Sequence, residues 1–212
     1  MTKFKLIRLK NSMVFSNGIA NLIGVSIAVF LARRIGTPMS PELSELGKLI
    51  NRIFIPCSFI LPVILTVIYE GPIRHYLNLS YKGQAMSGEI KVRARQRLLN
   101  EPFFLITLDF CLWLFAAILY SVVFRIFDGG RAVIFRSFSV SLFTRLITIT
   151  VAFFVFEHVL QRIIAPFFFP KGGLYATPKT LHIRIHTRPI ALLFACNIVP
   201  FIAILTTTQS HT

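Results

Sequence analysis

Three polar side chains inside otherwise apolar stretches are the residues of this sequence best placed to do chemistry. Asp109, Arg145 and Asn197 each lie in a run long enough to cross a bilayer. An ionisable group there is costly and usually marks function. At 1.5 Å per residue, they lie about 10, 18 and 12 Å from the same membrane face. They predict an intramembrane polar cluster that senses a ligand or couples helix movement. The alternative is an interhelical pair that only fixes helix register.

The other reactive residue types form no recognisable site in the sequence. Cys57, Cys111 and Cys196 all fall in apolar stretches and lack the spacing of metal ligands. His182 and His186 are four residues apart, but no carboxylate or cysteine completes a metal site. We find no Gly-rich phosphate loop, nucleophile elbow or paired carboxylates. We therefore expect no catalytic residue, metal or cofactor in this chain.

Composition excludes an ordinary soluble enzyme. The 212 residues are 55% hydrophobic and only 15% charged, with a net charge of +15, and the mean hydropathy is +0.71. Soluble domains have more charge and less apolar mass. The positive charge alone would fit a nucleic-acid binder, but the cations lie between long uncharged runs. That pattern is typical of a polytopic membrane protein and argues against a nucleic-acid partner.

Five apolar windows are long enough to span a membrane, at residues 13–32, 53–69, 102–124, 135–156 and 189–205. They predict an all-α helical bundle that forms a single transmembrane domain over residues 1–212, without a soluble domain. Pro56 and Pro62 predict a kink in the second span. Pro102 is expected in the first turn of the third helix.

The segment before the second span carries a helix start of its own. Ser40 can cap the helix, Pro41 suits the first turn, and Glu42 lies near the positive end of the helix dipole. We expect a helical lead-in that continues directly into the second span.

The distribution of Lys and Arg sets the expected orientation. With the N-terminus inside, inner segments carry 15 cations and outer segments carry 7, as the positive-inside rule requires. The most basic inner stretch contains Lys91, Arg93, Arg95 and Arg97. These cations are candidate contacts for anionic lipid head groups, or they serve only to set the topology.

Small residues recur at every fourth position of the first span, at Ser16, Ala20, Gly24 and Ala28. Such a stripe lets helices approach closely. It predicts a packing seam, either inside the bundle or between two copies of the chain.

Three segments resemble the membrane region of bacterial receptor-type class III adenylate cyclases. They are Arg95-Gln96-Arg97-Leu98-Leu99-Asn100-Glu101-Pro102-Phe103-Phe104, followed by Trp113; Phe167-Phe168-Phe169-Pro170-Lys171-Gly172-Gly173-Leu174; and Ile183-Arg184-Ile185-His186-Thr187-Arg188, which leads into a span with Pro200. They are also similar to the sensor regions of related histidine kinases. In the cyclase family, a region of usually six helices precedes a HAMP linker and a cytoplasmic cyclase domain that acts as a dimer. This sequence ends after its fifth predicted span, so no catalytic residue of the family is expected in it.

The resemblance implies a membrane-anchoring, dimerising and signal-sensing module of an adenylate cyclase-like protein, with no activity of its own. Its expected location is the bacterial cytoplasmic (inner) membrane. Its expected partners are the lipid bilayer, anionic lipids and a second copy of the chain. An alternative is a small transporter or permease subunit, with a midplane site formed by Asp109 and the proline-containing spans. An inert anchor is the third possibility.

Overall fold

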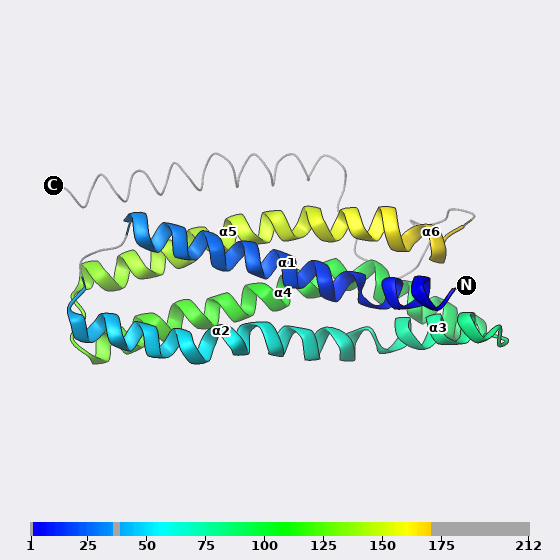
Figure 1. Ribbon diagram of the computed structural model, residues 1–212, viewed down its shortest axis with the longest axis horizontal. Helices are drawn as coiled ribbons and strands as arrows, with labels where there is room; N and C mark the ends of the chain where they lie inside the picture. Colours follow the sequence, from blue (N-terminus) through cyan, green and yellow to red (C-terminus); the bar gives the residue numbers. More distant parts are fainter. Residues whose placement is uncertain (1, 36–38, 171–212) are drawn as a thin grey trace.

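The computed structural model describes residues 2–35 and 39–170, which are almost entirely helical and contain no strand (Figure 1). The elements are α1 (Lys3–Ile35), α2 (Pro41–Tyr69), α3 (Gly71–Lys82), α4 (Gly88–Ile126), α5 (Arg131–Val159), a π-helical turn η1 (Leu160–Ile164) and α6 (Ala165–Phe168). The predicted all-α class is confirmed for these residues. The fifth predicted span, 189–205, lies outside them.

The four long helices run side by side along the length of the molecule (Figure 1). α5 packs against both α1 and α4, and α2 packs against α4. α3 lies near the N-terminus and contacts α4 and α1. We call this end of the bundle the α3 end. The opposite end, where α4 connects to α5, is the turn end.

Three helical segments of the described residues are long and apolar enough to cross a membrane: Pro41–Tyr69, Gly88–Ile126 and Val133–Phe168. They contain the second, third and fourth predicted spans. The first predicted span falls within α1, which has 33 residues and is about 50 Å long. These helices indicate a helical membrane protein. The number of five spans and the inside position of the N-terminus stay predictions.

The start of α2 confirms the predicted lead-in. Ser40 is the N-cap, and its side chain accepts a hydrogen bond from the Leu43 backbone N–H. Pro41 occupies the first turn with Glu42. The helix then continues without a break to Tyr69, and Pro56 and Pro62 both lie inside it.

The predicted start of the third helix at Pro102 is wrong. α4 begins at Gly88, where the Ser87 side chain caps the Ile90 N–H, so Pro102 lies well inside the helix. The added segment is stabilised by burial of Ala94, Leu98 and Leu99. A proline in a helix interior is tolerated where neighbouring helices enclose it, and Pro102 is itself buried.

The bundle interior is unusually polar along the apolar helices. Polar or charged side chains are buried at Ser16, Asn17, Asn21, Thr66, Asp109, Thr144, Arg145 and Thr148. Large apolar side chains face outward on the same helices, among them Ile60, Ile64, Ile68, Phe115, Ile118 and Val122. This inside-out pattern is expected where the surroundings are lipid and polar groups must find partners inside the bundle.

The α3 end contains a more conventional apolar core. Leu77 and Leu98 are fully buried, and Phe168 is nearly so. The Tyr76 ring packs on the Phe168 ring with a centroid separation of 4.8 Å. The helices therefore extend beyond the predicted spans into a compact cap made by α3, the first part of α4, the start of α1 and α6.

Candidate functional site

Asp109 is buried inside the bundle, where α4 faces α1. The Asn21 side-chain amide donates a hydrogen bond to Asp109 Oδ1 at 3.4 Å. The same amide also donates to Asn17 Oδ1 at 3.2 Å. Asp109 Oδ2 has no hydrogen-bond partner in the described part of the chain. Asp109 thus belongs to a polar contact between α1 and α4 that the sequence did not predict.

Arg145 on α5 is the largest fully buried side chain among the described residues, with only 1% of its surface exposed. Its guanidinium carbon lies 5.1 Å from the centre of the Phe110 ring. Within residues 2–35 and 39–170, none of its guanidinium nitrogens has a hydrogen-bond partner. The described residues also contain no ion pair between Arg145 and Asp109.

The sequence limits which anion could neutralise Arg145. All eight Asp and Glu residues precede residue 171, and Asp109 is the one acid inside a predicted span. Asn197, the third member of the predicted cluster, lies outside the described residues. The structure therefore places Asp109 and Arg145 in one bundle interior without pairing them, and the three-residue cluster stays a prediction.

The stripe of small residues on α1 packs inside the bundle over much of its length. Ser16, Ala20 and Gly24 are all buried. A Cβ added at Gly24 would lie 2.7 Å from Thr148 Cγ2, so the backbone of α1 at Gly24 lies directly against the Thr148 side chain of α5. The Ala28 side chain lies outside the described residues. This contact supports the intrabundle interpretation, whereas a seam between two copies stays a prediction.

A carboxyl pair that the sequence analysis missed lies at the α3 end. Glu70, between α2 and α3, is 3% exposed, and Glu101 on α4 is 1% exposed. The two carboxyls are close enough that each affects the proton affinity of the other. Two ionised carboxylates repel each other in a buried site, so their proximity favours a proton on one of them.

Arg74 on α3 supplies the cation of this carboxyl cluster, which we define as Glu70, Arg74 and Glu101. Arg74 Nη2 lies 2.6 Å from Glu70 Oε2 and also donates to the Lys10 backbone oxygen on α1 at 2.9 Å. Burial raises the pKa of Glu70 above its ordinary value, and the interactions with Glu101 and Arg74 only partly offset that effect. The cluster links α1, α3 and α4 at the end of α2.

Sequence reasoning could have found the pair from its position. Glu70 and Glu101 are 31 residues apart, so no local motif joins them. Each, however, directly borders a predicted span, after Tyr69 and before Pro102, and both borders face the same membrane side. Two acids that border the same membrane face on neighbouring antiparallel helices therefore lie at the same depth.

The four cations predicted to contact lipid do not share one face of α4. Lys91 and Arg93 are exposed. Arg95 Nη2 donates to the Phe168 backbone oxygen at 2.6 Å, and Arg97 lies over the Tyr69 ring at 4.7 Å. The last two therefore connect α4 to α6 and α2. Contact with lipid head groups stays a prediction, and the exposed Lys91 and Arg93 are the better candidates for it.

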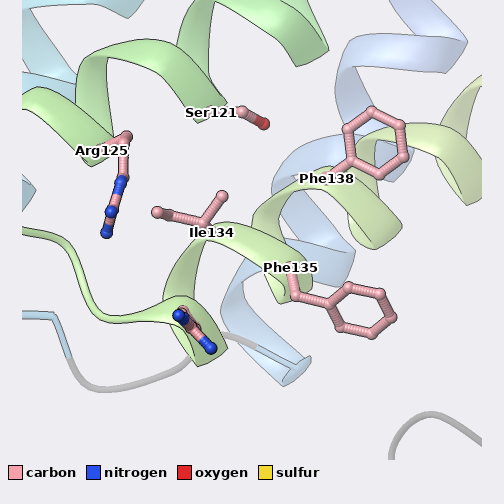
Figure 2. A pocket seen from close by; sticks show the side chains of 6 residues that line it. Ser121, Arg125, Ile134, Phe135 and Phe138 are labelled. Carbon is pink, nitrogen blue, oxygen red and sulfur yellow. The ribbon is translucent and has the colours of Figure 1, made fainter.

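A shallow pocket of about 420 Å³ lies at the turn end between α4 and α5 (Figure 2). Its lining residues are Ser121, Arg125, Arg131, Ile134, Phe135 and Phe138. Figure 2 shows the Arg125 side chain on α4 near Ile134 of α5, with the two phenylalanine rings further along α5. This site combines cations with an apolar wall.

The described residues contain no group of His, Cys, Asp and Glu side chains that could hold a metal ion. Cys57 and Cys111 are exposed on the apolar helices and unpaired. Cys196, His182 and His186 lie outside the described residues. Comparison with known proteins adds no assignment, because no family model, no curated protein and no solved structure matches the chain.

Proposed function

We propose that this chain is the membrane-anchoring, dimerising and signal-sensing module of an adenylate cyclase-like signalling protein of the bacterial cytoplasmic membrane. It has no catalytic activity of its own. The proposal combines the resemblance of its loop and helix segments to receptor-type cyclases with the helical membrane architecture. Lipids and a second copy of the chain are its proposed partners.

The observation that carries the proposal is the continuity of α4. This helix of 39 residues is about 58 Å long, roughly twice the thickness of a hydrocarbon core. Its first part, Gly88–Glu101, packs against α3, is hydrogen-bonded to α6 through Arg95 and contributes Glu101 to the carboxyl cluster. A displacement of the spanning part of α4 would therefore move the α3 end as one unit.

A chimera tests this proposal. Residues 1–212 are joined through a sixth helix and a HAMP linker to a class III cyclase domain, and cyclic AMP is measured in membranes. An unrelated dimeric membrane anchor on the same domain serves as the control. We expect Arg74→Met to change the output of the chimera at equal membrane level. The proposal fails if the chimera makes as much cyclic AMP as the control and Arg74→Met does not change that amount. It also fails if residues 1–212 alone make cyclic AMP.

A transporter or permease subunit is the second candidate, and a specific observation favours it. Asp109 Oδ2 and the Arg145 guanidinium are buried in the bundle interior and have no hydrogen-bond partner within residues 2–35 and 39–170, as polar groups on a substrate path often are. The test is solute uptake into proteoliposomes, with Arg145→Gln as the comparison. Uptake that requires Arg145 would favour transport. A sealed vesicle that takes up no tested solute while the chimera signals would exclude it.

A further inference from the structure

Two arginines, Arg125 and Arg131, line the pocket at the turn end. Arg125 is in the last turn of α4, and Arg131 is the first residue of α5. The turn that joins them is tight, because the Gly129 N–H bonds to the Phe124 oxygen at 2.7 Å. A Cβ on Gly129 would lie only 2.6 Å from that oxygen. Glycine at this position therefore sets the approach of the two helix ends.

Both arginines are available for an external anion. Each is exposed, and neither forms an ion pair within the described part of the chain. Asp128 is the nearest acid in sequence and lies in the turn itself, with a φ of 53°. Two cations against this single carboxylate leave the rim of the pocket positive.

The depth of the pocket relates it to the membrane surface. The apolar stretch of α4 ends at Phe124, so Arg125 lies at the boundary of the hydrocarbon core, where head groups begin. Along α5, Ile134 and Phe138 lie about 5 and 10 Å further toward the bilayer centre than Arg131. Phe135 between them is 62% exposed. The pocket is thus cationic at head-group level and apolar at acyl-chain level.

We propose that this pocket binds an anionic phospholipid, with the phosphate between Arg125 and Arg131 and an acyl chain along Phe135 and Phe138. Guanidinium groups recognise phosphate oxygens through paired hydrogen bonds. A free phosphate would use the cations but leave the apolar wall uncovered. The site is distinct from Lys91 and Arg93, which lie at the α3 end. It requires that α4 and α5 cross the membrane, and it does not depend on the signalling role.

Native mass spectrometry of the purified full chain measures the affinity for the first bound lipid. The ligands are phosphatidylglycerol, phosphatidylcholine with the same acyl chains, and glycerol phosphate. The test variant is Arg125→Gln/Arg131→Gln. The matched control is Lys91→Gln/Arg93→Gln, which removes the same charge from exposed positions at the other end. We expect phosphatidylglycerol to bind the test variant about 30-fold more weakly, because the two lost cations contribute similar factors to the affinity. The control variant should bind phosphatidylglycerol nearly as tightly as the parent protein does.

Three results would overturn the proposal. The first is an equal loss in both double variants, which would mean general charge attraction. The second is unchanged binding in the test variant. The third is glycerol phosphate binding as tightly as the lipid, which would identify a free phosphate site. If the glutamine variant does not fold by circular dichroism, Arg125→Lys/Arg131→Lys keeps the charge and removes the planar fork. It should lose part of the affinity, and parental affinity would contradict the arginine geometry.

Discussion

Replacing Arg74 with methionine leaves the two buried carboxyls of the carboxyl cluster without a cation. Removing one partner of a buried ion pair costs about 3–5 kcal/mol. We take the low end, because 23% of the Arg74 side chain remains exposed. The free energy of unfolding should therefore fall by about 3 kcal/mol at about pH 8. At about pH 4, where the carboxyls are protonated, we expect a loss of about 1 kcal/mol, from the hydrogen bond to the Lys10 oxygen.

The sign of this pH dependence follows from Glu70. Burial raises the pKa of Glu70 in the folded protein above its ordinary value of 4.5. The favourable contribution is therefore complete below pH 4.5 and is lost as the pH rises through the folded value. Arg74 is one of the groups that hold this pKa down. Its removal raises the pKa of Glu70 further and extends the loss of stability to higher pH.

Unfolding in mixed detergent micelles, followed by circular dichroism at both pH values, measures the effect. The control is Arg93→Met, which removes an exposed cation from α4 and should change stability by no more than about 0.5 kcal/mol. Equal losses for Arg74→Met at the two pH values would refute the argument. So would a loss no larger than that of the control.

Three further outcomes are expected, two from the packing of the helices and one from the predicted orientation in the membrane. Gly24→Ala should lower the free energy of unfolding by about 1–3 kcal/mol because the new methyl group meets α5. Gly18→Ala, with open space around it, should instead stabilise α1 by up to about 1 kcal/mol. Thermal unfolding compares the two variants, and equal shifts in melting temperature would contradict the close contact at Gly24. Arg95→Ala should lower the free energy of unfolding by about 2 kcal/mol, because the charged hydrogen bond to α6 is lost, while Arg93→Ala should leave it nearly unchanged. A chemical unfolding titration distinguishes the two variants, and equal effects would contradict that hydrogen bond. With the native cysteines removed, a cysteine at Asp128 should react with an impermeant maleimide in intact cells if the N-terminus is inside; labelling only after lysis would reverse the predicted orientation.

The sequence predicts the helical class and the lead-in to α2 because these depend on local signals. Apolar runs of sufficient length and the cap at Ser40 act through neighbouring residues. The sequence did not predict the start of α4 at Gly88, because a proline such as Pro102 usually lies in a first turn and not in a helix interior. Burial of the segment before Pro102 determines where the helix begins. That burial is a tertiary effect.

Candidate site residues were predicted less completely, and for a similar reason. The cost of a charge in a span identifies Asp109 and Arg145 without neighbours being known. Their partners depend on helix rotation, which turned Asp109 toward Asn21. The pairing of Glu70 with Glu101 depends on the relative levels of two antiparallel helices, which local spacing does not encode.

The π-helical turn between α5 and α6 has a consequence for insertions and deletions. A π-turn accommodates one extra residue without ending the helix, so the helix after Ile164 keeps the angle that it would have without that residue. Deleting one residue here would restore regular α-helix and leave Phe168 facing Tyr76, whereas deleting one residue from the regular α-helix earlier in α5 would rotate Phe168 by about 100°. The Phe168 ring would then leave Tyr76, and its carbonyl would turn away from Arg95. The five residues of the π-turn, Leu160–Ile164, are therefore the place where this helix tolerates the loss of one residue without losing the contacts at its far end.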